Sequence, residues 1–195
     1  MSDPFLKITV DTGDLKRAMA ALGSKAPAAI MRALNKTARS ARTQATRAVA
    51  KEIRLKQKEV RPMLPVIPAT RQNLEAKLVA RGRPISLMRL GARQTRQGVV
   101  YRGPRGPVLI RSAFIRTMPH ARRPSVWRRV RPSVRASRGA WSLNLPIDKQ
   151  LGPSVPRLVL ERGIFEGIAR TAPGTLAKNL AQETNYLLNK DQRRG

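Results

Sequence analysis

Arginine is the residue type that gives this sequence its chemistry. Between Arg61 and Leu145 the chain carries 19 Lys or Arg residues and one carboxylate, Glu75, within a formal net charge of +29 over 195 residues. Self-repulsion on this scale opposes a compact state, so the excess indicates a partner, most simply a polyphosphate such as nucleic acid. The candidate phosphate neighbours are Arg81, Arg83, Arg89, Arg93, Arg96, Arg102 and Arg105.

The same charges have a second interpretation, as solvated or inter-subunit side chains. That interpretation stays open for any one arginine, but 11 acids cannot neutralise 40 basic residues even when copies assemble. The sequence shows no zinc-finger spacing, no aromatic RNA-recognition signature and no zipper heptads, so base-specific readout is not indicated. Binding through phosphates alone would be independent of sequence and would weaken steeply with salt.

Residue types that usually carry catalysis are scarce. The chain has no cysteine, which excludes thiolate zinc sites, and its one histidine, His120, has no second imidazole with which to share a metal. The segment from Gly91 to Gly98 is bracketed by glycines but lacks the lysine and hydroxyl pair of a phosphate-binding loop. The sequence therefore predicts no catalytic, metal-binding or cofactor-binding residues and a protein that is not an enzyme.

Membrane and targeting signals are also missing from the pattern. No window approaches 18 uninterrupted apolar residues, so no membrane span and no membrane partner is predicted. The segment from Lys25 to Arg54 has the Ala-, Arg- and Ser-rich composition of an organelle transit peptide. A strand-like segment with three acids precedes it, which disfavours that reading.

The elements that would position the arginines begin with a long amphipathic helix over residues 28–53. Its apolar residues recur at three- and four-residue steps, and basic residues gather on the opposite side. Alanine dominates the apolar stripe, so a neighbouring sheet or subunit can approach closely and is expected to cover it. The stripe consists of Ile30, Leu34, Ala38, Ala41, Ala45, Val49 and Ile53, and the basic face of Arg32, Lys36, Arg39, Arg47, Lys51 and Arg54.

Shorter elements flank this helix. Alternating apolar residues predict strands, and the Gly103-Pro104-Arg105-Gly106 turn predicts a hairpin with Arg105 at its tip. Residues 131–140 lack apolar periodicity and are expected to form a mobile loop unless bound. The expected strands cover residues 5–11, 74–80, 98–102, 107–111, 126–130 and 141–145, and the expected further helices cover residues 14–22, a short one from about residue 56, and 175–189.

This order of elements predicts an α+β fold, in which the long N-terminal amphipathic helix packs on a small antiparallel β-sheet or partial barrel and a C-terminal helix follows. We expect a single domain over residues 1–190. It would comprise an N-terminal strand and helices (1–60), a basic β-rich middle (61–145), and an interface loop with the C-terminal helix (146–190). A polar tail over 191–195 ends the chain.

Several strings in this order resemble the minor tail protein Z family of tailed phages and prophages. The resemblance covers roughly Ala28 to Pro156 and departs from the family pattern at Trp127, Asn144 and Leu151. The strings are Ala33-Leu34-Asn35-Lys36-Thr37-Ala38-Arg39, Lys56-Gln57-Lys58-Glu59-Val60, Gly82-Arg83-Pro84-Ile85-Ser86-Leu87, Gly91-Ala92-Arg93-Gln94-Thr95-Arg96-Gln97-Gly98, and Leu145-Pro146-Ile147 with Leu151-Gly152-Pro153-Ser154-Val155-Pro156.

The resemblance implies a structural virion protein that completes the head-proximal end of a long tail. Such a protein helps the tail join the capsid and helps hold or pass the genome end, after assembly in the host bacterial cytoplasm. The implied partners are copies of itself in a hexameric ring, tail terminator or tail tube proteins, head-neck connector proteins, and double-stranded phage DNA in the channel.

The apolar, proline-stiffened segment from Leu145 to Pro156 is expected to pack against a neighbouring subunit or tail protein. A buried crossover within one chain is the alternative. The candidate interface residues are Leu145, Pro146, Ile147, Leu151, Gly152, Pro153, Ser154, Val155 and Pro156.

Two other functions fit the charge. A free nucleic-acid-binding protein of the ribosomal or chromatin-associated kind explains the arginines and the missing catalytic groups, but not the ordered strings. The other alternative is a tail or neck subunit whose basic surface binds acidic partner proteins and never touches DNA. Retention on DNA with a steep salt dependence would argue against this last alternative.

Overall fold

The computed structural model describes residues 4–9, 13, 20, 23–119, 122–129 and 147–192. Contacts divide the chain into two compact units. Unit 1 comprises residues 1–50, 56–82 and 155–195, and unit 2 comprises residues 51–55 and 83–154. His120, the strand expected over 141–145, the loop over 131–140 and, apart from Ala20, the helix over 14–22 lie outside the described residues. The single domain over 1–190 stays a prediction.

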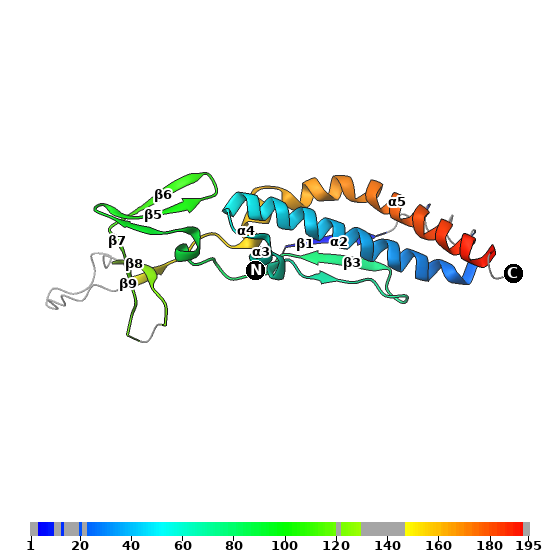
Figure 1. Cartoon of the computed structure of the whole chain (residues 1–195), viewed down its shortest axis with the longest axis horizontal. Helices are drawn as coiled ribbons and strands as arrows, with labels where there is room; N and C mark the ends of the chain where they lie inside the picture. The colour runs from blue at the N-terminus through cyan, green and yellow to red at the C-terminus, as the bar shows by residue number, and fades with distance from the viewer. Residues whose placement is uncertain are drawn as a thin grey trace, which may run out of the picture. The chain divides into compact units, whose positions relative to one another are not determined.

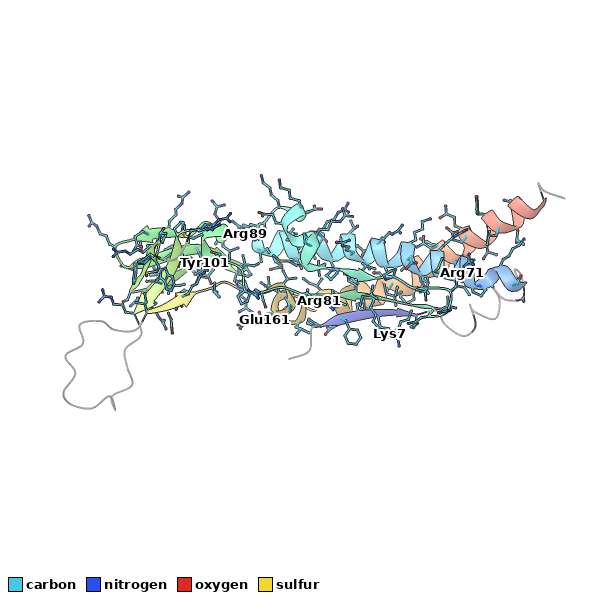
Figure 2. The ribbon with its side chains drawn as sticks, turned by 90° about the horizontal axis from the view of Figure 1, so that it is seen from below. Lys7, Arg71, Arg81, Arg89, Tyr101 and Glu161 are labelled. Carbon is cyan, nitrogen blue, oxygen red and sulfur yellow. The ribbon has the colours of Figure 1, made fainter. Side chains whose placement is uncertain are left out.

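The predicted α+β class is confirmed, with a long N-terminal helix, small antiparallel sheets and a C-terminal helix (Figure 1). After a 3-10 turn, η1 (Gly23–Lys25), helix α2 runs from Ala26 to Ile53. All seven residues of its predicted apolar stripe are buried, and all six residues of its predicted basic face are exposed. Long side chains extend from α2 on the side away from β1 (Figure 2). The helical period therefore predicted both faces correctly.

The C-terminal part of unit 1 contains two helices, α4 (Val155–Glu161) and α5 (Ile164–Gln192). The sequence predicted a helix over 175–189, but α5 begins at Ile164 and continues through Pro173. A proline inside a helix removes one backbone donor and costs about 3 kcal/mol. Buried Phe165 and Ile168 extend the apolar stripe before the proline, and their packing offsets that cost.

Helices α2 and α5 lie side by side and antiparallel (Figure 1). The Asn179 amide donates to the Thr37 hydroxyl at 2.9 Å, while Arg32 pairs with Glu183 at 3.9 Å. Ala41 and Ile168 line the same narrow space between the two helices. The alanine stripe of α2 permits this close approach, and a helix of the same chain, α5, packs there, where the sequence predicted a neighbouring sheet or subunit.

A three-stranded antiparallel sheet completes unit 1, in the order β1 (Phe5–Thr9), β3 (Glu75–Val79), β2 (Val66–Ile67). Leu6 is paired with Leu78 and Ile8 with Ala76, and these four side chains are buried on one face. The short helix α3 (Gln57–Val60) and the 3-10 turn η2 (Arg61–Met63) connect α2 to this sheet. Pro62 lies in η2, so the helix expected near residue 56 ends where proline requires.

Unit 2 is built from two more three-stranded antiparallel sheets, where the sequence predicted a single sheet or partial barrel. The 3-10 turn η3 (Leu87–Leu90) precedes them. The first sheet has the order β4 (Arg93–Thr95), β5 (Gly98–Gly103), β6 (Gly106–Arg111), and the second has the order β7 (Ala113–Arg116), β8 (Ser125–Arg129), β9 (Ile147–Gln150). Strands β2, β4, β7 and β9 were not predicted, since two to four residues are too few to show an alternating pattern.

Among the described residues, no helix combines the length and apolar character that crossing a bilayer requires.

Candidate nucleic-acid interface

The β4-β5-β6 sheet gathers basic side chains on one face. Arg93 is opposite Val100, and Arg102 is opposite Pro107, while Gly98 is opposite Arg111. Because side chains alternate along a strand, these residues share one face of the sheet with Thr95 and Leu109. The three arginines are exposed. Strand pairing therefore converts a scattered run of arginines into a single basic surface.

The opposite face of the sheet is tied to the rest of unit 2 through Gln94. Its side-chain amide donates to the carbonyls of Gly98 and Ala113, each at 3.3 Å, and its Oε1 accepts from the Ile115 backbone N–H at 2.8 Å. Val99, on the same face, is buried. The glutamine thus joins β4 and β5 to β7 and fixes which face of the sheet remains exposed.

Two glycines bracket this string for structural reasons. Gly91 adopts a left-handed conformation, with φ of 71°, and ends η3 by donating its N–H to the Met88 carbonyl. Gly98 has φ of 150°, and a Cβ there would lie 2.1 Å from the Ile110 carbonyl oxygen. No other residue fits that close approach of β5 to β6. The segment from Gly91 to Gly98 therefore has an architectural role as well as a basic surface.

A hollow of about 430 Å³ lies on the basic face of unit 2. Arg54, Arg93 and Arg102 line it, each from a different segment of the chain. The rest of the lining is mainly glycine and apolar or hydroxylated side chains: Gly91, Thr95, Val100, Tyr101, Gly103, Gly106 and Pro107. Tyr101 is labelled in Figure 2. The hollow therefore combines three cations with a lining that contains no acid.

The seven predicted DNA-facing arginines are all exposed. Arg81 belongs to unit 1, where its N–H donates to the Met63 carbonyl at 2.8 Å, and the other six belong to unit 2. The hollow brings Arg93 and Arg102 together, whereas Arg105 lies in the β5–β6 turn and Arg96 in the β4–β5 turn. Contact of these residues with DNA stays a prediction.

Two basic residues of this surface were absent from the predicted set. Arg111 was detectable, because the predicted turn at residues 103–106 places Gly98 opposite Arg111 and so on the same face as Arg102. Arg54 was assigned to the outer face of the long helix, and it immediately follows the last helical residue, Ile53. No pattern in the sequence indicates that this residue lines a hollow formed by strands roughly 40 to 50 residues further along.

The predicted interface segment is partly paired within its own chain. Gly152 donates its N–H to the Ile85 carbonyl at 2.8 Å, Ile85 donates to the Pro153 carbonyl at 3.2 Å, and Leu151 is paired with Ser86. Val155 is buried at the start of α4, whereas Ile147 and Leu151 are 38% and 45% exposed. Leu145 and Pro146 lie outside the described residues. Burial against another subunit stays a prediction for the exposed pair.

Within the described part of the chain, no group of three or more His, Asp or Glu residues could hold a metal ion. The described acids of unit 2, Glu52 and Asp148, are two residues in a unit with many cations. The described part of the chain thus combines an α+β fold with an exposed arginine surface.

The family comparison identifies the class more closely. The family model of the prophage minor tail protein Z (GPZ) matches residues 14–190, so this chain belongs to that family. The match includes most of both units. No curated protein and no solved structure matches the chain. The family makes this a minor tail structural protein of a phage or prophage, which is part of a virion and interacts with other virion proteins.

Proposed function

We propose that this protein completes the head-proximal end of a long phage tail. It supports the joining of head and tail, and it positions or passes the genome end through sequence-independent contacts between arginines and DNA phosphates. Copies form a ring, with sixfold symmetry expected for a tail tube, which contacts tail terminator or tail tube proteins on one side and head-neck connector proteins on the other. The observation that carries the proposal is the exposed arginine surface of unit 2 in a member of a minor tail protein family.

The charge of unit 2 supports DNA as the partner. Unit 2 carries 18 Lys or Arg residues and two acids. Repeated around a ring, this imbalance would create a positive collar that attracts a polyanion. A conduit also requires that DNA can move, and screened contacts with phosphates permit movement better than bidentate base readout does.

Binding of duplex DNA tests the chemistry directly. We expect the purified protein to bind duplexes of about 20 base pairs and unrelated sequence with equal affinity, and the affinity to fall steeply as salt rises. Binding would be measured by fluorescence anisotropy over a salt series. Absence of binding at physiological salt, together with capture of an acidic tail or neck protein, would favour the neck subunit that never touches DNA.

Infectivity tests the role in joining. The change is Arg93→Glu with Arg96→Glu, and the matched control is Arg39→Glu with Arg47→Glu on the exposed face of α2. We expect the first pair to leave tails assembled, as seen by electron microscopy, while the number of infectious joined particles falls by about tenfold or more. Normal titres would remove Arg93 and Arg96 from the mechanism.

Substitution in the exposed apolar pair of the interface segment tests whether copies assemble into a ring. We propose that Ile147 and Leu151 pack against a neighbouring subunit or tail protein, since both are exposed while the adjacent Gly152 is held by Ile85. Leu151→Asp should shift the assembled ring towards monomer in native mass spectrometry without changing the far-UV circular dichroism. A wild-type protein that stays monomeric and is absent from virions would contradict the assignment to the tail.

A further inference from the structure

We propose that Arg54, Arg93 and Arg102 form a discrete cradle for one backbone phosphate of duplex DNA. This inference rests on the proposed function, and it deepens it by separating a built phosphate site from the arginines that merely add charge. The cradle is the hollow of about 430 Å³ in unit 2. It adds Arg54, which the sequence assigned to the outside of a helix, to two of the seven predicted DNA-facing residues.

The three arginines line the hollow from three separate segments of the chain. Arg54 follows the end of α2, Arg93 lies on β4 and Arg102 on β5. Arg102 lies over Gly91, where an added Cβ would be 3.8 Å from its Nε. Convergence of planar, permanently charged donors is the arrangement that recognises a phosphate.

The three arginines are available for a ligand. The ion pairs and side-chain hydrogen bonds found among the described residues do not include Arg54, Arg93 or Arg102. Val100 and Pro107 supply apolar lining beside them. Apolar walls reduce hydration, so an anion between the guanidinium groups is held more strongly than on an open surface.

The backbone of Arg54 is a second, independent observation. Its φ is 52°, a left-handed backbone conformation that residues other than glycine, asparagine and aspartate rarely adopt. A helix usually ends at such a position with glycine. An arginine held there against its backbone preference suggests that its side chain serves a function.

Two triple variants of equal charge test the cradle. The first is Arg54→Gln, Arg93→Gln, Arg102→Gln, and the matched control is Arg83→Gln, Arg96→Gln, Arg105→Gln, which removes exposed arginines of the same unit that do not line the hollow. Affinity for the same duplex is measured at fixed salt. We expect the cradle variant to lose about tenfold to a hundredfold, and the control about threefold or less, because charge-assisted hydrogen bonds to phosphate exceed screened attraction.

Arg54→Gly separates binding from folding. Glycine relieves the left-handed backbone, so the thermal midpoint should stay unchanged or rise by a few degrees, while duplex affinity falls because the guanidinium is lost. A residue whose side chain only supported the fold would give a lower midpoint. A lower midpoint with unchanged affinity per folded molecule would overturn the role of Arg54.

Each outcome has a separate meaning. If the wild-type chain does not bind the duplex, the DNA contact in the proposed function fails and the cradle fails with it. If the wild type binds and the two triple variants lose equal affinity, the proposed function stands and the cradle is overturned. If inorganic phosphate at constant ionic strength raises the thermal midpoint of the wild type but not of the cradle variant, and duplex affinity is equal in both, the occupant is free phosphate and the DNA assignment is overturned.

Discussion

Units 1 and 2 are stabilised in different ways. Of the 33 buried hydrophobic residues in the described part of the chain, 26 belong to unit 1 and seven to unit 2. Unit 1 also balances 22 basic residues with nine acids, whereas unit 2 sets 18 against two. Unit 1 therefore has the larger apolar core to offset its charge. Unit 2 must maintain its shape with little core and strong self-repulsion.

Unit 2 therefore depends on backbone geometry, whereas unit 1 depends on the burial of apolar side chains. Paired strands, the Gln94 hydrogen bonds and glycines at tight approaches specify the β4-β5-β6 sheet. Such features leave one face of the sheet free for exposed arginines. An exposed arginine surface in unit 2 is thus combined with a unit 1 that has the larger apolar core.

Gly98→Ala should give the largest effect and should act on unit 2. The new Cβ would lie 2.1 Å from the Ile110 carbonyl oxygen, at a φ of 150°, so β5 and β6 cannot stay paired as they are. We expect a loss of about 4 kcal/mol in the free energy of unfolding of unit 2. Hydrogen exchange would show β5 and β6 losing protection while α2 keeps it. Equal loss of protection in α2 would show that the two units unfold together and are not stabilised separately.

Asn35→Ala should give a smaller effect, confined to unit 1. The Asn35 side chain donates to the Ala69 carbonyl at 3.1 Å and accepts from the Ala69 N–H at 2.8 Å, so it fastens the loop before β3 to α2. The substitution leaves both partly buried groups unpaired, which we expect to cost about 2 kcal/mol. Chemical denaturation measures the loss. The control is Gln44→Ala on an exposed position of the same helix, which should change stability by less than about 0.5 kcal/mol.

Periodicity explains why unit 1 was predicted better than unit 2. The stripe from Ile30 to Ile53 spans many turns, so its burial could be predicted from spacing alone. Helix α5 was predicted too short, because its first part is held through Pro173 by burial of Phe165 and Ile168, and Ile168 packs beside α2. A periodic pattern that continues over many helical turns is a strong local signal, whereas tolerance of a proline inside a helix is decided by tertiary contacts.

The sequence predicted that the candidate site is a basic surface, but it did not predict which residues form it. The excess of arginine over acid indicated a basic surface, and the turn at residues 103–106 fixed the register that aligns Arg102 with its neighbours. The sequence could not show that Arg54 lines the hollow. Its position there depends on a left-handed backbone at the end of α2, and that residue is distant in sequence from the strands that form the hollow. The β4 strand of three residues likewise carries too little pattern to show that Arg93 and Val100 are opposite each other.

Glu75→Gln should give the smallest effect, and its pH dependence distinguishes paired from unpaired charge. Lys7 and Lys77 each lie 2.8 Å from this carboxylate, and their hydrogen bonds lower the pKa of Glu75 from its ordinary value of 4.5. A lowered folded pKa stabilises the protein above the unfolded pKa, and that contribution is lost as the pH falls through the folded value. Wild type should therefore be slightly more stable than Glu75→Gln at neutral pH, and the difference should shrink below about pH 4.5.

Urea unfolding over a pH series measures that difference, with Glu161→Gln as the control, because Glu161 pairs with Arg157 on an exposed helix surface. An exposed pair within one helix contributes a few tenths of a kcal/mol at most. A difference for Glu75 that stays constant from neutral to acid pH would mean that the two lysines do not hold the carboxylate ionised. The sheet of unit 1 would then gain nothing from its acid, and the contrast with the acid-poor unit 2 would rest on the apolar core alone.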